Sequence, residues 1–174
     1  MKVLGVCGSL QAKSGNLALL KAAAALMPPG VEFVLFDGLR DLPPFNPDSE
    51  ANGELKSVRR WRLALEESDA VLIASPEYGF SMPGALKNAI DWVIGSGELE
   101  RKVVAITAAV AWAGRGRRGL QALRDTLSAV SATIVGGDPI PKGPEFESDV
   151  AALVRTLLEK LLERASLTLP TIRR

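Results

Sequence analysis

The sequence alternates between short apolar runs and longer segments in which apolar residues recur at helical spacing, and this alternation limits the fold more than any other feature. The apolar runs contain many β-branched residues and cover residues 3–7, 31–36, 70–75, 103–107 and 132–135. Runs of this kind are typical of strands that are buried on both faces. Their alternation with helices predicts an α/β domain in which helices cover both faces of a five-stranded parallel sheet.

The helical segments complete the predicted order of elements. They lie near residues 17–27, 55–65, 84–93, 120–130 and 150–162, and each follows one of the apolar runs. The last segment has the clearest helical period, with apolar residues at Val150, Leu153, Val154, Leu157, Leu158, Leu161 and Leu162. A chain of 174 residues has the length of one domain. We therefore expect a single domain over residues 1–174, with residues 166–174 as a loosely held tail.

The composition excludes several kinds of catalytic site. The chain has no histidine and only one cysteine, Cys7. Catalytic triads and dyads that contain histidine, zinc sites built on histidine or on a group of cysteines, and an internal disulfide are therefore excluded. Cys7 falls inside the first apolar run, which predicts a buried, unreactive thiol. We expect no metal site, so any enzymatic chemistry should depend on a cofactor.

The charge balance and the hydropathy bear on partners and location. A formal net charge of +1 argues against a nucleic-acid partner, because binding to a polyanion requires a strongly basic surface. No apolar run has the length of a membrane-spanning helix, and the first residues do not resemble a secretory signal. We therefore expect a cytoplasmic protein that has no membrane-bound segment.

Ligands of open parallel sheets bind beyond the carboxyl ends of the strands, so the loops at residues 8–16, 75–84 and 107–119 form the candidate site. The first loop, GSLQAKSGN, joins a strand to a helix and is rich in small and polar residues. Backbone N–H groups and the positive end of the helix dipole meet there, which favours a phosphate. Its residues match neither a Walker A loop nor the dinucleotide fingerprint. In the alternative interpretation, Ser14 or Asn16 only caps the helix.

The second loop begins the stretch SPEYGFSMPGALKNAIDW, residues 75–92, which is unusual for a simple connection. Pro76 restricts the residue before it to extended geometry, and Gly79 lets the main chain come close to a ligand. Together with the first loop, this stretch resembles the motifs of the NADPH-dependent FMN reductases, a family that also includes quinone, azo-dye and chromate reductases. The usual family forms are Gly-Ser-Leu-Arg-x-x-Ser-x-Asn and Pro-Glu-Tyr-Asn-x-Ser-x-Pro-Gly-x-Leu-Lys-Asn-Ala-x-Asp-Trp.

The resemblance implies a flavodoxin-like three-layer sandwich with strand order 2-1-3-4-5 and a bound FMN. The residues that it assigns to FMN are Ser9, Gln11, Ser14 and Asn16 near the phosphate, Pro76, Glu77, Tyr78 and Gly79 near the isoalloxazine ring, and also Ala109. No side chain is implied as a catalytic group, because hydride passes between the nicotinamide and flavin N5 and positioning dominates such a reaction. A positioning role for Tyr78 stays open. In the family the helix after the second loop often lies at a dimer interface, which implies a homodimer or a homotetramer.

The chain departs from the family pattern in three places. Gln11 stands where the family usually has arginine, so a cationic contact to a phosphate of FMN or of the nicotinamide nucleotide is missing. Gly79 replaces the common asparagine but keeps the backbone donor. The third loop matches the family's Gly-Gly-x-Arg-Ala only in part. Arg115 and Arg117 are candidates for contact with the nucleotide, the alternative being a solvated basic helix start, and Trp112 fits either a ligand contact or the core.

The function implied by the resemblance is that of an FMN-dependent NAD(P)H oxidoreductase. It would use NADPH or NADH to reduce a quinone, an azo compound, free flavin or a similar small acceptor by ping-pong exchange. Two alternatives stay open, namely a flavodoxin-type electron carrier and a flavin-free nucleotide-binding relative. Carriers of that type are usually strongly acidic, so the net charge of +1 favours the reductase.

Overall fold

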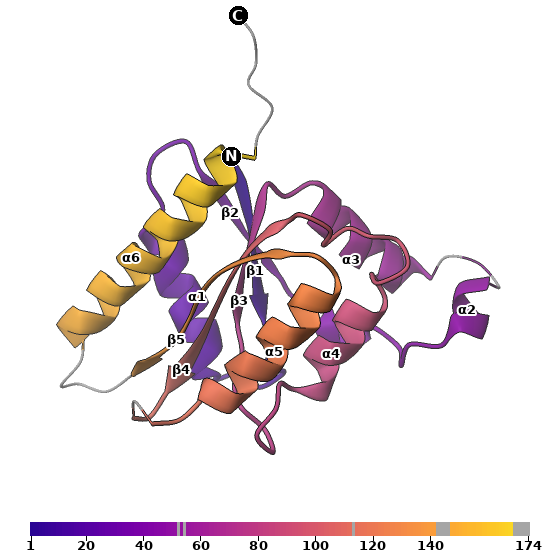
Figure 1. Cartoon of the computed structure of the whole chain (residues 1–174), viewed down its shortest axis with the longest axis horizontal. Helices are drawn as coiled ribbons and strands as arrows, with labels where there is room; N and C mark the ends of the chain where they lie inside the picture. The colour runs from indigo at the N-terminus through magenta and orange to yellow at the C-terminus, as the bar shows by residue number, and fades with distance from the viewer. Residues whose placement is uncertain (52, 54, 113, 142–146, 169–174) are drawn as a thin grey trace, which may run out of the picture.

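The computed structural model describes residues 1–51, 53, 55–112, 114–141 and 147–168. Within these residues, one sheet contains the strands in the order β2-β1-β3-β4-β5 (Figure 1). The strands are β1 (Lys2–Cys7), β2 (Glu32–Phe36), β3 (Ala70–Ala74), β4 (Val103–Val110) and β5 (Thr133–Pro141). Every neighbouring pair is parallel. The predicted fold class and strand order are confirmed.

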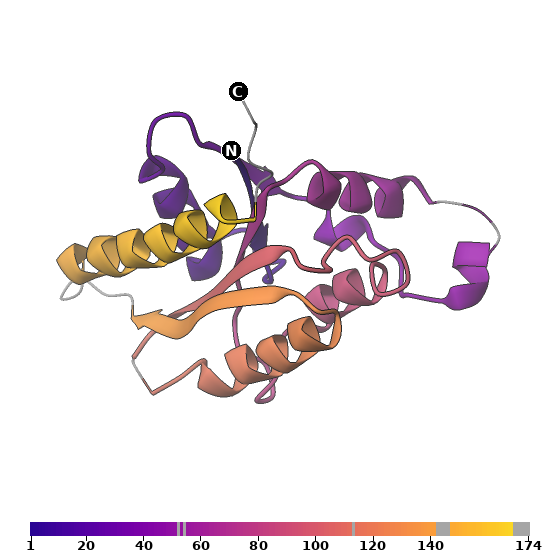
Figure 2. The same ribbon diagram turned by 45° about the horizontal axis from the view of Figure 1, so that its top comes forward.

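Helices cover both faces of the sheet, as Figures 1 and 2 show. One layer contains α1 (Gly15–Ala25) and α6 (Glu147–Ser166), and the other contains α3 (Lys56–Glu66), α4 (Gly84–Asp91) and α5 (Arg117–Ala129). The connection between β2 and α3 also holds the 3-10 helix η1 (Leu39–Asp41) and the short helix α2 (Pro47–Ala51), which the sequence pattern does not predict. No helix among the described residues combines the length and apolar composition that crossing a bilayer requires.

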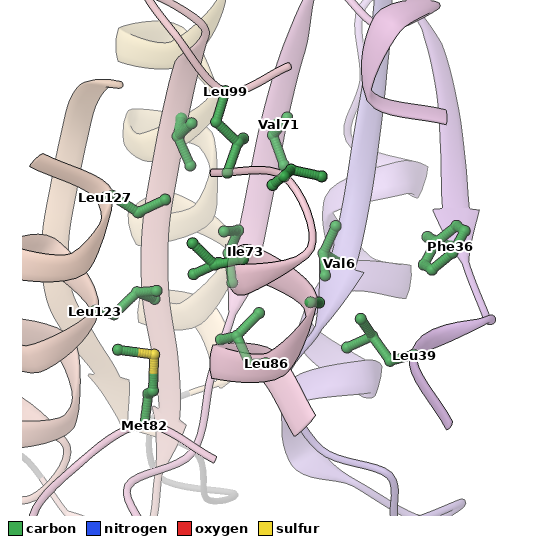
Figure 3. Packing of buried hydrophobic residues seen from close by; sticks show 14 of the residues in the cluster. Val6, Phe36, Leu39, Val71, Ile73, Met82, Leu86, Leu99, Leu123 and Leu127 are labelled. Atoms are coloured by element: carbon green, nitrogen blue, oxygen red, sulfur yellow. The ribbon is translucent and has the colours of Figure 1, made fainter. Parts of the chain in front are cut away.

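Strand β3 shows why the apolar runs are nearly continuous. All of its residues are buried. Val71 and Ile73 belong to the apolar cluster beneath α3, α4 and α5, whereas the other three residues belong to the cluster beneath α1 and α6. Successive side chains of a strand point to opposite faces, so a strand between two helical layers needs apolar residues at every position. Figure 3 shows the first cluster, with Ile73 lying close to Leu86 of α4.

Strands β4 and β5 run farther than the sequence pattern predicts, to Val110 and Pro141 rather than to residues 107 and 135. The apolar pattern of the last strand stops before Gly136 and Gly137, and glycine ordinarily weakens a strand. These two glycines have φ values of +71° and +113°, and beyond them the ladder resumes with Ala108 opposite Pro139. This irregularity lets β5 continue. Because β4 continues to Val110 and α5 begins at Arg117, the third loop is shorter than the predicted stretch of residues 107–119.

The first residues of the predicted tail, residues 166–168, continue from or lie directly beside the end of α6. Helix α6 continues to Ser166, and Ala165 is fully buried. The hydroxyl of Thr168 donates a hydrogen bond to the carbonyl of Ala165 at 2.8 Å. Residues 169–174 of the predicted loose tail lie outside the described residues.

Candidate cofactor site

The connections that follow β1, β3 and β4 meet at the carboxyl edge of the sheet, as predicted. These three strands are neighbours in the sheet, and backbone hydrogen bonds continue beyond the strand ends. The N–H of Gly8 donates to the carbonyl of Ala74, and the N–H of Ser75 donates to the carbonyl of Thr107, each at 2.9 Å. The first two loops therefore start from fixed positions beside the neighbouring strand.

The first loop presents two buried hydroxyl groups at the start of α1. Ser14 is the N-cap of α1, and its Oγ accepts a hydrogen bond from the N–H of Asn16 at 3.2 Å. Ser9 Oγ accepts a hydrogen bond from the N–H of Gln11 at 3.3 Å. Each hydroxyl acts here as an acceptor and keeps its proton for another partner. Ser14 is thus the helix cap, and both hydroxyl donors still stay available.

Unpaired backbone donors lie in the same loop. Within the described part of the chain, the N–H groups of Ala12, Lys13 and Gly15 donate to no protein acceptor. The first turn of α1 contains no acidic residue, so no carboxylate of its own neutralises the positive end of the helix dipole. Free N–H groups at a positive helix end favour an anion such as a phosphate.

Asn16 ties the first loop to β4. Its side chain is buried, and Oδ1 accepts a hydrogen bond of 2.8 Å from the N–H of Ala109, 93 residues farther along the chain. This bond orients the amide, and Nδ2 has no acceptor among the described residues. Asn16 can therefore still donate to a ligand. The N–H of Ala109 is already used, so a contact between Ala109 and a cofactor would have to involve its other atoms.

The second loop is a two-residue hairpin. Tyr78 and Ser81 exchange two backbone hydrogen bonds of 2.9 and 3.0 Å. Between them, Gly79 and Phe80 have φ values of +56° and +63°, which identify a type I′ turn. Tyr78 and Phe80 are 56% and 68% exposed. In the described structure the N–H groups of Gly79 and Phe80 have no acceptor, so donors and aromatic surface lie together at the hairpin tip.

Phe80 lies at the tip of this hairpin in the candidate site, although the sequence pattern does not indicate it. A glycine in the first central position between two pairing residues is a hairpin signal. The second central position also requires a positive φ, which bulky residues rarely adopt, so phenylalanine obscures the signal. The strained backbone of Phe80 at an exposed tip is the kind of outlier that clusters at ligand-binding sites.

Glu77 uses its side chain to cap α5. Its Oε2 accepts a hydrogen bond of 2.9 Å from the N–H of Gly119 in the first turn of that helix. Helix α5 has no acidic residue in its own first turn, and its N-cap residue, Gly116, offers no side chain. A carboxylate at this position satisfies an unpaired N–H and opposes the positive helix end. This contact explains Glu77 without a role in proton transfer.

The third loop leads into a basic helix start. Arg115, Arg117 and Arg118 are all exposed, and the last two lie in the first turn of α5. Arg117 Nη1 lies 3.9 Å from Asp138 Oδ1, whereas the guanidinium carbon of Arg118 lies 4.4 Å from the centre of the Phe80 ring. Exposure of the arginines is compatible with both interpretations of this loop, and Arg118 is distinguished from its neighbours by its contact with the hairpin.

Cys7 and Trp112 are more exposed than core residues. Cys7 is only partly buried, because β1 ends there and the chain opens into the first loop. Its Sγ donates to the carbonyl of Ser9 at 3.4 Å. The prediction of a buried thiol is therefore wrong. Trp112, for which a core position and a ligand contact were both open, is 58% exposed just after β4, so it is not a core residue.

The second half of the 75–92 stretch holds α4 against the connection that follows β2. The side chains of Asn88 and Trp92 both donate to the carbonyl of Pro43, at 2.9 and 2.8 Å. Asn88 Oδ1 also accepts a hydrogen bond from the N–H of Phe45 at 2.7 Å. The ring of Phe45 packs edge-on against Trp92. These motif residues therefore position the helix that follows the hairpin.

Arg40 reaches the first loop from another connection. It lies in η1, and its Nη2 donates to the carbonyl of Leu10 at 2.9 Å. Together with Ser9 and Gln11, it lines a cavity of about 190 Å³ beside the loop. Nothing local in the sequence indicates this contact, because Arg40 and Leu10 are 30 residues apart. A positive charge thus lies beside the loop in which Gln11 replaces the usual arginine.

Residues 1–141 match the model of the family described as NADPH-dependent FMN reductase. The chain is 43% identical over 119 residues to the NAD(P)H-dependent FMN reductase PA1204 of Pseudomonas aeruginosa, covering 68% of this chain and 63% of that protein. It is 45% identical over 96 residues to the NAD(P)H:quinone oxidoreductase of Solanum tuberosum, covering 53% and 49% of the two chains.

These two matches thus span between about half and just under two thirds of the relatives' lengths. Among solved structures, the chain is similar to FerB of Paracoccus denitrificans, described as a flavoenzyme NAD(P)H:(acceptor) oxidoreductase. The TM-score is 0.85 at 27% identity, with 95% of this chain and 97% of FerB covered. The likeness to FerB therefore extends over nearly the whole of both chains.

Proposed function

The chain belongs to the NADPH-dependent FMN reductase family, and on that basis we propose that it is an FMN-dependent NAD(P)H oxidoreductase. It would pass hydride from a nicotinamide through bound FMN to a small acceptor such as a quinone, an azo compound or free flavin. The observation that carries the proposal is the presence of two sets of unpaired donors, at the start of α1 and at the hairpin tip, beyond the neighbouring strands β1 and β3. A phosphate joined to a flat ring with polar edges requires donors at both places.

The residues present fit FMN. Its phosphate would be held by Ser9, Gln11, Ser14 and Asn16, and its ring by Pro76, Tyr78, Gly79 and the main chain of Glu77. The hydroxyl groups, the amide Nδ2 of Asn16 and the free N–H groups of the first loop are all donors, as binding to a phosphate demands. When bound, FMN supplies the centre that accepts and donates hydride.

The protein itself would position the two reacting rings and would not supply a general acid or a general base. Tyr78 stays 56% exposed beside the free N–H groups of the hairpin, which suits a role in positioning the reacting rings. The carboxylate of Glu77 is engaged by Gly119. No histidine is present, and hydride transfer needs alignment of the two rings more than a proton relay.

We further propose that Arg115 and Arg117 contact the phosphates of NADPH or NADH. Both are exposed, Arg115 in the third loop and Arg117 at the start of α5. The third loop follows β4, which lies beside β3, the strand that precedes the hairpin. Their charges suit a nucleotide, because arginine binds phosphate oxygens in a bidentate manner. Substrate steering by such charges would weaken with rising ionic strength.

The purified protein is expected to bind added FMN, and NADPH or NADH should bleach the flavin under anaerobic conditions. A quinone should then restore the colour. Double-reciprocal plots of the initial rate against quinone concentration, made at several fixed nicotinamide concentrations, should give parallel lines, as expected for ping-pong exchange. Absorbance spectroscopy and stopped-flow mixing measure each step. A protein that takes up no FMN would be a flavin-free relative. One whose FMN is not reduced by either nucleotide would be an electron carrier instead.

We also propose that the protein assembles as a homodimer, or as a homotetramer, and acts in the cytoplasm on its nicotinamide substrate. Tyr78, Phe80 and Trp112 lie on loops after neighbouring strands, and each is more than half exposed. Exposed aromatic surface of this kind often marks an interaction site. Sedimentation equilibrium with and without FMN distinguishes the assemblies, and a monomer under both conditions would contradict the proposal.

Gln11→Arg is expected to tighten FMN binding by up to about tenfold, because an arginine adds a charge-assisted hydrogen bond to the phosphate. The gain should stay modest, since Arg40 already brings one guanidinium to the loop. Fluorescence titration with FMN measures it. Gln11→Glu is the matched control and should weaken binding. Equal affinities for the two variants would place residue 11 away from the phosphate.

A further inference from the structure

The hairpin of the second loop is held by a helix that belongs to a different connection. The hairpin follows β3, whereas α5 follows β4, yet two contacts join them. At the base of the hairpin, Glu77 Oε2 accepts a hydrogen bond from Gly119 at 2.9 Å. At its tip, the guanidinium carbon of Arg118 lies 4.4 Å from the centre of the Phe80 ring. Arg118 and Gly119 are consecutive residues, so one helical turn contacts both ends of the hairpin.

The approach between the two elements is close. A Cβ atom added to Gly119 would lie 3.0 Å from both Cα and Cβ of Glu77 and 3.1 Å from the carbonyl oxygen of Ser81. Real Cβ atoms rarely come this near to backbone atoms. The first turn of α5 therefore rests directly on the base of the hairpin, with no layer of side chains between them.

The hairpin needs such support. An isolated two-stranded hairpin is marginally stable in water, and this one consists of one bridge with Tyr78 opposite Ser81. Its tip also contains Phe80, whose φ of +63° is unfavourable for a bulky residue. Backbone geometry of this kind persists only when the surrounding structure determines it. Helix α5 is the element that contacts both its base and its tip.

We infer that α5 sets the position of the hairpin that faces the flavin, and that Glu77 and Arg118 are positioning residues for FMN. The inference rests on the proposed function, because it assigns the hairpin to the flavin ring. Neither side chain needs to touch the cofactor. Glu77 acts through the backbone of α5, and Arg118 acts through the ring of Phe80. The contact also separates Arg118 from Arg115 and Arg117, which stay free of the hairpin and available to a nucleotide.

A role confined to helix capping predicts something different. If Glu77 only caps α5, its removal lowers the stability of the protein but leaves the affinity and the environment of bound flavin unchanged. If the contact positions the hairpin, removal of Glu77 or of Arg118 alters both of these properties. Arg118 is not a cap, so its variant separates the two roles most clearly.

The test compares Glu77→Ala, Glu77→Gln and Arg118→Ala in the full chain with wild type. Arg155→Ala is the charge-matched control, because Arg155 is exposed on α6. FMN affinity is measured by fluorescence titration, the environment of the ring by visible circular dichroism, and stability by urea unfolding. Glu77→Ala should weaken FMN binding about five- to tenfold and Arg118→Ala about two- to fivefold, and both should change the flavin dichroism. Glu77→Gln should stay within about threefold of wild type, because its amide oxygen still accepts the hydrogen bond. Arg155→Ala should match wild type.

The inference is overturned if Glu77→Ala and Arg118→Ala bind FMN with wild-type affinity and dichroism, whatever their stability. A wild-type protein that takes up no FMN would refute the proposed function instead. Even then, amide hydrogen exchange tests the hairpin directly. The N–H groups of Tyr78 and Ser81 are hydrogen-bonded in the hairpin, and they should exchange faster in Glu77→Ala and Arg118→Ala than in wild type or Arg155→Ala. Unchanged exchange would refute the positional role.

Discussion

Replacing Gly79 by valine is expected to weaken FMN binding by about 30-fold or more. Gly79 has a φ of +56°, a conformation that costs an ordinary L-residue about 1–2 kcal/mol and a β-branched residue more. For an ordinary residue, a penalty of that size corresponds to roughly 5- to 30-fold in affinity if the hairpin must regain its shape to bind, and valine should lie at or above the upper end. Space is not the limit, since a Cβ at this position would meet no atom within 4 Å. Fluorescence titration with FMN measures the effect.

Gly79→Asn is the matched control for this experiment. Asparagine adopts positive φ far more readily than valine, and it is the residue that the family usually has at this position. The asparagine variant should bind FMN within about threefold of wild type. Equal losses for valine and asparagine would point to side-chain bulk rather than backbone geometry. Wild-type affinity for valine would remove the hairpin from the flavin site.

Replacing Asn16 by leucine should lower both stability and FMN affinity. Leucine branches at the same atom as asparagine but cannot accept the hydrogen bond of 2.8 Å from the N–H of Ala109. A buried donor left without a partner costs about 1–3 kcal/mol. The amide Nδ2 that we propose as a donor to the phosphate is lost as well, so FMN affinity should fall by at least about 30-fold. Urea unfolding of the FMN-free protein and FMN titration measure the two effects separately.

Asn16→Asp separates the two roles of the asparagine. Its carboxylate still accepts the hydrogen bond from Ala109, and a negative charge in the first turn of α1 is favourable to the helix. Its stability should therefore stay near that of wild type. The same charge repels a phosphate, so FMN binding should be lost nearly as far as in the leucine variant. If the aspartate variant bound FMN as well as wild type, the phosphate would have to lie elsewhere.

The fold was predictable from the sequence because its signals are local. Each strand carries its own apolar run, as in β3, and each helix its own period. The extension of β5 was not predictable in this way, since Gly136 and Gly137 look like a strand end. Their positive φ values and the resumed pairing of Ala108 with Pro139 depend on the neighbouring strand, which a single stretch of sequence does not reveal.

The candidate site was predictable in its location but not in its internal contacts. The topology of a parallel sheet brings the first, second and third loops to one edge, whatever their sequences. The contacts that join these loops span 93 residues between Asn16 and Ala109 and 42 residues between Glu77 and Gly119. Side chains whose partners lie so far away in the sequence do not produce a periodic pattern along the chain. Phe80 was not predictable either, because its φ of +63° is one that bulky residues rarely adopt.

The carbonyl of Pro43, which accepts two hydrogen bonds, divides the long connection between β2 and α3 into two parts that should tolerate insertions differently. Asn88 and Trp92 both anchor the chain at this carbonyl, so altering the length of the chain near residues 43–45 would pull on α4. Helix α2 lies beyond that anchor and stands away from the sheet in Figure 1. A tag or reporter inserted near α2 should therefore leave the position of α4 unchanged, because the hydrogen bonds to Pro43 hold the chain before α2. The part of this connection around α2 is therefore the suitable place to attach a label in studies of the proposed flavin site at the carboxyl edge of the sheet.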